Sequence, residues 1–329
     1  MFDVDPAYIA GIVFVIAVIL AGRLAMTRLF DRAHARAHRQ RARKDVRKDV
    51  ASHHQPRFMV GPHAVATHPA GWQLGASSWY ALAAGEPLDT FGYTDPQHSR
   101  AILAEAWAVR TRLDLYVQLL SLLVSGHRAD FDAERAAWLA LPPAGQRALA
   151  AGLHRDAKHS GTAAETELRL RRVRKDVRGA RTIDFTAWDL VRTIMLARAG
   201  VGAGYLSEAE AVDIGWIASA GLRASYRDWA CLYDHFARGR WYWEGVDGAG
   251  EAASDEHARQ FLAVLNGPGG PLSVVPWDAP LRTSSYGFIG ELGGAGVLPN
   301  LPLAPAQPWQ SGLWEAVRSA AMNGPVQGR

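Results

Sequence analysis

The chain has 329 residues, enough for one large domain or two modest ones, and 49% of them are hydrophobic, as in ordinary globular proteins. Its 36 Lys and Arg against 32 Asp and Glu give a net charge of only +4, so no overall positive field indicates a nucleic-acid-binding protein. The single cysteine, Cys231, excludes an internal disulfide framework and fits a reducing compartment.

An uncharged apolar segment occupies residues 6–22 and is dominated by Ile, Val and Ala. If Arg23 extends its guanidinium to the lipid headgroups, the apolar span reaches residue 27 and approaches the ~20 residues that a bilayer-spanning helix needs. A cleaved signal peptide would carry basic residues before the apolar run, whereas two aspartates and no Lys or Arg stand there. We therefore expect residues 1–27 to form a transmembrane anchor that enters the inner membrane through residues 6–27.

The residues that follow the apolar segment are strongly basic. Between Arg28 and Lys48 there are nine Lys and Arg and two Asp, which by the positive-inside rule keeps the C-terminal part in the cytoplasm. The same residues can hold anionic lipid headgroups, at about 1 kcal/mol per basic residue; the alternative is a topology signal alone. We interpret residues 28–70 as a basic juxtamembrane linker. His34 and His38 lie one helical turn apart but lack a third ligand, so no metal site is predicted.

The first half of the soluble part reads as a series of helices. We expect one helix over Gly71–Ala84 and a long one over Arg100–Ser125, with Ser99 as its N-cap, because apolar residues recur at steps of three and four. GlyHisArg at 126–128 is expected to close the long helix. The Pro pair at 142–143 separates the two shorter helices that follow.

A strongly basic helix is expected from Ala163 to Gly179. Its Lys and Arg can form a patch for anionic lipid, RNA or an acidic protein. No aromatic residue is interleaved with these charges, although proteins that bind single strands need stacking surfaces beside them. Nucleic acid is therefore disfavoured as a partner.

The segment from Asp184 to Gly245 carries five tryptophans and reads as three amphipathic helices. Gly200 and Gly239 are the expected ends of the first and third helices. Ser207 and Glu210 have the spacing of a capping box at the start of the second helix, which gives Glu210 a structural role.

No sequence motif in the chain identifies a chemical reaction. A glycine-rich phosphate loop, a nucleophile motif and a zinc-binding helix are all missing from the sequence, so no cofactor is predicted. If the protein is an enzyme, we expect its catalytic residues among four charged residues of the first Trp-rich helix: Asp184, Asp189, Arg192 and Arg198. Binding would use aromatic and charged residues of the same segment: Trp188, Trp229, Arg240, Trp241, Trp243 and Glu244.

Several of these blocks resemble a known family. TrpAspLeuValArg at 188–192, SerTyrArgAspTrp at 225–229 and GlyArgTrpTyrTrpGluGly at 239–245 are similar to the bacterial family called domain of unknown function 1266. TrpGlnLeuGlyAlaSerSer at 72–78 looks like an upstream block of that family. The resemblance covers roughly residues 71–245 and implies a mostly helical bacterial domain with no settled activity.

The remaining residues, 246–329, are expected to form a Gly/Pro-rich tail. Residues 267–308 include eight glycines and eight prolines, a composition that does not sustain long helices. We expect two short helices in the tail, at residues 254–265 and 310–322.

These observations predict an all-α fold: a compact multi-helix domain at residues 71–245, preceded by one N-terminal transmembrane helix and followed by the Gly/Pro-rich C-terminal tail. The preferred function is a protein-binding or regulatory module held at the cytoplasmic (inner) membrane of a bacterium, with the C-terminal domain in the cytoplasm and an unidentified protein as partner. One alternative is a membrane-tethered enzyme with an Asp/Arg site in residues 184–245. A second alternative is contact of the basic helix with anionic lipid or RNA.

Overall fold

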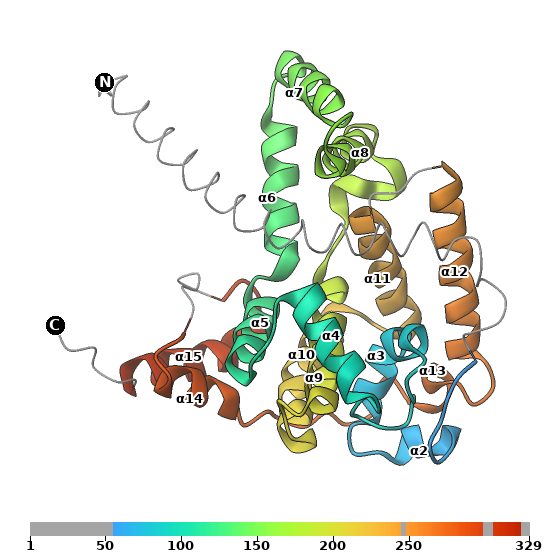
Figure 1. Cartoon of the computed structure of the whole chain (residues 1–329), viewed down its shortest axis with the longest axis vertical. Helices are drawn as coiled ribbons and strands as arrows, with labels where there is room; N and C mark the ends of the chain where they lie inside the picture. Colours follow the sequence, from blue (N-terminus) through green and yellow to red (C-terminus); the bar gives the residue numbers. More distant parts are fainter. Residues whose placement is uncertain (1–54, 245–247, 299–304, 324–329) are drawn as a thin grey trace.

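The computed structural model describes residues 55–244, 248–298 and 305–323 and shows helices joined by loops, without a strand in these ranges (Figure 1). This confirms the all-α class for the described part of the chain. Residues 1–27, predicted as a transmembrane anchor, and the basic residues 28–48 lie outside the described ranges. Within those ranges no helix is both long and apolar enough to cross a bilayer.

The core is built around α9 (Thr186–Ala203), whose residues are nearly all buried. A helix that is buried on every side must be covered by several partners. Among the described elements at least six helices contact it: α3 (Gly71–Ala84), α4 (Pro96–Trp107), α5 (Arg112–Val124), α6 (Gly126–Ala140), α10 (Glu208–Ser225) and α11 (Trp229–Glu244). The central position of α9 places its charged residues inside the protein.

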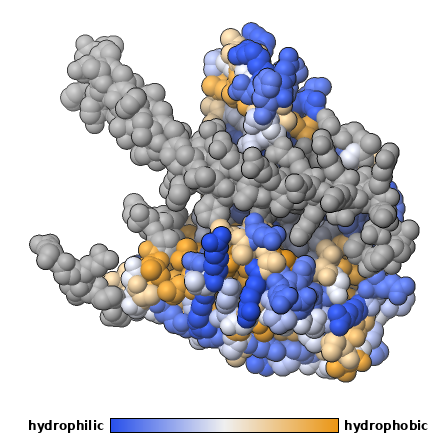
Figure 2. Space-filling model, in the orientation of Figure 1, coloured by the Kyte–Doolittle hydropathy of each residue, from blue (hydrophilic) through white to orange (hydrophobic). Residues whose placement is uncertain are grey.

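Three helices form what we call the arm: α6, α7 (Pro143–Asp156) and α8 (Gly161–Lys175). It rises from the body at the top of Figure 1, and α7 packs on α8 without burying any residue completely. Hydrophilic residues dominate the tip of the arm in Figure 2.

The remaining elements lie at the edges of the body. They are α2 (Pro62–Thr67), η1 (Val177–Thr182), α12 (Gly248–Asn266), α13 (Pro271–Val274), α14 (Gly287–Gly294), η2 (Pro308–Gln310) and α15 (Ser311–Asn323).

The expectation of one long helix over residues 100–125 is wrong, because two helices, α4 and α5, occupy this stretch. The chain adopts a left-handed conformation at Ala108, with φ 53°, and a capping box formed by Thr111 and Asp114 starts α5. Asp95, and not Ser99, caps α4, because its carboxylate accepts from two backbone N–H groups of the first turn.

Two glycines that were expected to end helices lie inside them. α9 continues through Gly200 and ends before Gly204, which has φ 78°. A Cβ on Gly200 would lie 2.5 Å from a methyl group of Leu115, so the missing side chain lets α5 approach. α11 likewise continues through Gly239 to Glu244. The capping box of Ser207 and Glu210 is confirmed at the start of α10.

The tail contains more helix than its composition indicates. α12 is 19 residues long, and α14 forms where no helix was expected, so the expectation of only two short helices is wrong. Phe288, Ile289 and Leu292 of α14 are buried beside α5 and α15. Tertiary packing therefore overrides the low helix propensity of the glycines in α14. The last expected helix, at 310–322, is confirmed as α15.

Candidate binding site

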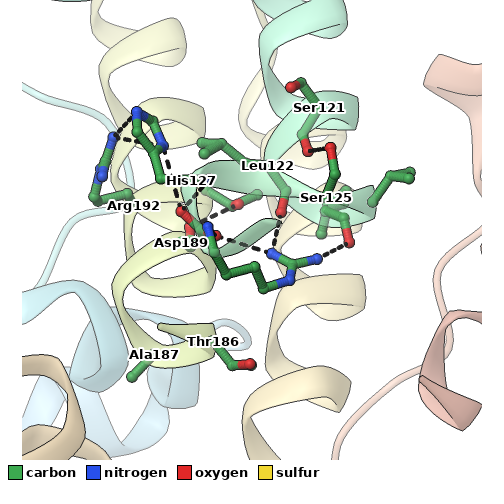
Figure 3. Close-up of polar contacts among 12 residues, drawn as sticks. Ser121, Leu122, Ser125, His127, Thr186, Ala187, Asp189 and Arg192 are labelled. Atoms are coloured by element: carbon green, nitrogen blue, oxygen red, sulfur yellow. Dashed lines mark hydrogen bonds and ion pairs between the residues drawn. The ribbon is translucent and has the colours of Figure 1, made fainter. Parts of the chain in front are cut away.

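Asp189 holds two helices together from the first turn of α9. Its buried carboxylate accepts the backbone N–H groups of His127 at 3.1 Å and Arg128 at 3.0 Å, and the Arg128 guanidinium at 3.1 Å (Figure 3). Asp189 therefore caps the N-terminus of α6, where an anion is stabilised. Gly126 has φ 57°, and a Cβ there would lie 2.0 Å from Oδ2 of Asp189. α6 therefore begins at Gly126. The expectation that residues 126–128 only close the preceding helix is wrong.

The environment of Asp189 keeps it ionised. Burial alone would raise the pKa of this carboxyl, but the hydrogen bond and charge of His127 and the charges of Arg128 and Arg192 outweigh burial and hold the pKa below its usual value. The His127 Nδ1 atom lies 3.4 Å from Oδ1 of Asp189. The carboxylate is thus a structural acceptor, and at neutral pH it holds no proton to transfer.

Arg192 lies on the next turn of α9, on the same face as Asp189. Its side chain is only 5% exposed, and its Cζ lies 4.5 Å from the ring centroid of Trp107 and 4.7 Å from that of Trp188. Nη2 lies 3.4 Å from each ring nitrogen of His127. Nη1 is buried and has no hydrogen-bond partner among the described residues. The guanidinium therefore lies against two aromatic rings but makes few hydrogen bonds at its edge.

A second charged group comes from the last turns of α11. Arg240 and Glu244 form an ion pair at 2.5 Å, and Glu244 also accepts the hydroxyl of Ser254 at 2.5 Å. The ring of Trp243 packs 5.5 Å from that of Trp188, centroid to centroid. The end of α11 therefore lies beside the Arg192 group.

Tyr80 of α3 connects the two groups. Burial raises the pKa of its hydroxyl, and the charges of Arg192, Arg240 and Glu244 all act on it. It therefore stays a neutral hydroxyl among charged neighbours. We call the set defined by these contacts the Trp–Arg cluster: Tyr80, Trp107, Trp188, Arg192, Arg240, Trp243 and Glu244.

A cleft of about 400 Å³ runs between α11 and α12 next to this cluster. Arg238, Arg240 and Trp241 line it on the α11 side, and Ser254 and Asp255 line it on the α12 side. Because Arg240 belongs to both the cleft and the cluster, the two form one continuous region.

Asp184, a candidate catalytic residue, lies outside the cluster. Its carboxylate accepts the hydroxyl of Tyr226 at 2.7 Å and the backbone N–H of Thr186 at 2.8 Å. It therefore joins the start of α9 to the end of α10.

Arg198 lies at the opposite end of α9 and is fully buried. It donates to the carbonyl oxygens of Phe91 at 3.0 Å, Pro87 at 2.8 Å and Thr90 at 2.9 Å, and to the hydroxyl of Ser77 at 3.1 Å. These bonds fasten the loop between α3 and α4 to the core.

Two of the predicted binding tryptophans also have structural positions. Trp229 packs against Trp72 at 4.8 Å and Trp277 at 4.9 Å, away from the cluster. Trp241 donates its indole N–H to Glu251 at 2.8 Å and is covered by the guanidinium of Arg172 at 4.0 Å. The structure thus brings together Trp188, Asp189, Arg192, Arg240, Trp243 and Glu244, and separates them from Asp184, Arg198 and Trp229.

Sequence reasoning missed four residues of this region: Tyr80, Trp107, His127 and Arg128. They come from α3, α4 and α6. His127 and Arg128, the two residues of α6, precede Asp189 by 62 and 61 residues. GlyHisArg at 126–128 was the one available signal, since a glycine followed by a helical pattern also fits a helix start. No group of three or more His, Cys, Asp or Glu with a metal-binding arrangement occurs among the described residues.

The chain matches the family described as "Protein of unknown function (DUF1266)" over residues 102–277, more than half of its length. The chain belongs to this family, as the resemblance of residues 71–245 implied. The matched range contains α9 and α11 and therefore most of the Trp–Arg cluster. No curated protein and no solved structure matches the chain.

Proposed function

We propose that this member of the DUF1266 family is a protein-binding or regulatory module, tethered to the cytoplasmic membrane through residues 6–27 with its helical domain on the cytoplasmic side. The observation that carries the proposal is the Trp–Arg cluster with its adjoining cleft. Tryptophan and arginine are the residues most enriched at the energetic centres of protein interfaces. Here they gather beside a concave surface from two helices of the matched range.

Binding is preferred to catalysis because the candidate carboxylates already have partners. A general base needs an acceptor within reach of a substrate proton. Asp189 is fully buried and already accepts three hydrogen bonds, and Asp184 holds Tyr226 and a backbone N–H. Glu244 is paired with Arg240. The enzyme alternative is left without an available base among these residues.

The basic-helix alternative also loses part of its support. Arg172 of α8 is only 3% exposed, donates to the carbonyl of Trp241 at 2.8 Å and stacks on that ring. Arg178 is bound to Asp255 at 2.7 Å. Three basic residues of α8 remain exposed, namely Arg171, Arg174 and Lys175.

Partner capture tests the binding proposal. The full chain and an Arg240→Ala variant are used as bait on detergent-solubilised membranes, with Arg155→Ala on the exposed face of α7 as the matched control. We expect specific partners to be retained by the control and reduced about ten-fold or more by Arg240→Ala, since loss of a central interface arginine costs more than ~1 kcal/mol. Identical capture by all three baits would contradict the proposal.

A C-terminal fusion to a reporter that is active only in the periplasm tests the tether and its orientation. We expect the fusion to be inactive, because the basic residues after the apolar segment keep the domain in the cytoplasm. The control replaces residues 1–27 with an export signal and should activate the reporter. Activity of the unaltered fusion would overturn the topology.

A further inference from the structure

The charged groups in and beside the Trp–Arg cluster include more arginines than carboxylates. Three arginines, Arg128, Arg192 and Arg240, face two carboxylates, Asp189 and Glu244. Arg128 is paired with Asp189 at 3.1 Å and Arg240 with Glu244 at 2.5 Å. In the described part of the chain Arg192 has no carboxylate at bonding distance. The group therefore carries one uncompensated positive charge.

The contacts of Arg192 with the two tryptophan rings do not use its N–H donors. Trp107 and Trp188 both lie against the guanidinium, whose N–H bonds lie in its own plane. Within the described ranges Nη1 has no partner, and the 3.4 Å contacts of Nη2 with His127 are longer than ordinary hydrogen bonds. A buried polar group without a partner is costly, and a bound ion or ligand is one explanation for its presence.

His127 is a partly exposed neighbour of this edge. Its side chain is 33% exposed, and it contacts both Asp189 and Arg192 only at 3.4 Å. The same ring also packs against Trp107 at 6.2 Å and Phe131 at 6.5 Å, centroid to centroid. Movement of His127 would change its contacts with Arg192 and with Trp107, and would expose more of the edge of Arg192.

We infer that Arg192 is the anchor for a carboxylate group, which reaches the guanidinium on the His127 side and accepts hydrogen bonds from its free edge. A planar carboxylate matches the paired N–H groups of arginine, and a stacked guanidinium is already held in position to receive it. The inference rests on the proposed function and names its chemistry: the carboxylate belongs to an acidic side chain of the partner protein. A free small carboxylate offers the same chemistry.

The indole N–H signals of Trp107 and Trp188 in the full chain, held in detergent micelles, report on this site. Sodium acetate is titrated to about 100 mM, the range for a single weak ion pair, against sodium chloride at equal ionic strength. We expect a saturable shift of both signals with acetate, abolished in Arg192→Met and retained in Arg112→Met, an arginine on the surface. His127→Ala should lower the acetate concentration at half saturation, because it clears the access route. Assignment uses Trp107→Phe and Trp188→Phe.

Partner capture separates the two sources of the carboxylate. An acetate response that depends on Arg192 supports a site that takes free carboxylates. No acetate response, together with an about ten-fold loss of partner capture in Arg192→Met, supports the partner's acidic side chain. Arg192→Lys keeps the charge but not the paired donors and should recover only part of the capture, which also covers the case that Arg192→Met folds poorly.

Capture that is unchanged in Arg192→Met, with no acetate response, would overturn the inference. If Arg240→Ala still abolishes capture in that case, the proposed binding function stands without the carboxylate anchor. If Arg240→Ala has no effect either, both proposals are wrong.

Discussion

The two ends of α9 each bury an arginine, and the two arginines have opposite surroundings. Arg198 is fully buried, and its guanidinium donates to three carbonyls and one hydroxyl. Arg192 is 5% exposed, lies against two aromatic rings and has one nitrogen without a partner among the described residues. Burial lowers the pKa of both side chains, so neither burial nor pKa distinguishes them. The number of acceptors around each guanidinium does, and it separates a structural arginine from one suited to a ligand.

The Arg198 end explains how a long loop is ordered without a strand. The loop between α3 and α4 turns its carbonyl groups inward, and a buried carbonyl needs a donor. Arg198 supplies several donors from one side chain. Asp89 of the same loop accepts the backbone N–H groups of Met59, Val60 and Gly61 and so attaches residues 59–61 to it.

Arg198→Met should give the largest loss of stability. Methionine fills much of the volume but donates nothing, so four acceptors lose their donor inside the core. We expect the free energy of unfolding to fall by roughly 3–5 kcal/mol, less than the sum of the separate bonds, because the contacts are not additive. Urea unfolding of the full chain measures it, with Arg155→Met on α7 as a control that should change little. A loss below about 1 kcal/mol would remove the contrast between the two ends of α9.

Asp189→Asn tests the region next to Arg192. The amide keeps the shape but loses the charge that faces the N-terminus of α6 and Arg128, and we expect a loss of roughly 2–4 kcal/mol at pH 7. Because the folded pKa of Asp189 is below its unfolded value of 3.8, its contribution is present above that value and is lost as the pH falls through the folded pKa. The difference between the wild type and Asp189→Asn in urea unfolding should therefore shrink below about pH 4. A difference that stays constant down to pH 3 would show that charge is not the cause.

The sequence predicted best what depends on neighbours along the chain. The capping box of Ser207 and Glu210 uses residues three apart, and it is present as expected. The helical class, the break at the Pro pair and the final helix follow from patterns of the same short range. The family resemblance was also carried by continuous blocks of residues.

The failures share a different physical origin, which is contact across the fold. Gly200 and Gly239 resemble helix ends, but their missing side chains serve Leu115 and Trp188 on neighbouring helices. Gly126 resembles a helix end because the residue that caps α6, Asp189, is 62 residues away from His127. For the same reason Arg192 and Arg198 look equivalent in the sequence. Their partners come from other helices and loops, and no local spacing reveals them.

Arg112→Met gives a reference value for an arginine on the surface. Arg112 binds Glu210 at 2.5 Å and Glu291 at 2.7 Å, and hydrogen bonds from Arg112 and Ser207, against a smaller effect of burial, lower the pKa of Glu210 to about 2. Both partners are more than a third exposed, so solvent screens the interaction despite the large shift. We expect a loss of only about 0.5–1 kcal/mol, reduced further in 1 M salt, by urea unfolding. A larger loss would mean that exposed pairs rival the buried bonds of Arg198.

Arg192→Met should have the smallest effect on stability, and it is the sharpest test of the comparison. The substitution removes a buried charge that has no carboxylate partner, and it leaves an apolar chain between Trp107 and Trp188, where sulfur and aromatic rings pack favourably. The lost cation–π contacts and the relieved desolvation oppose each other, so we expect a change within about 1 kcal/mol of zero, of either sign. Urea unfolding of Arg192→Met and Arg198→Met under identical conditions measures the two losses of stability and compares them. If the two variants lose equal stability, Arg192 is a structural arginine like Arg198, and its unpartnered nitrogen gives no reason to expect a ligand there.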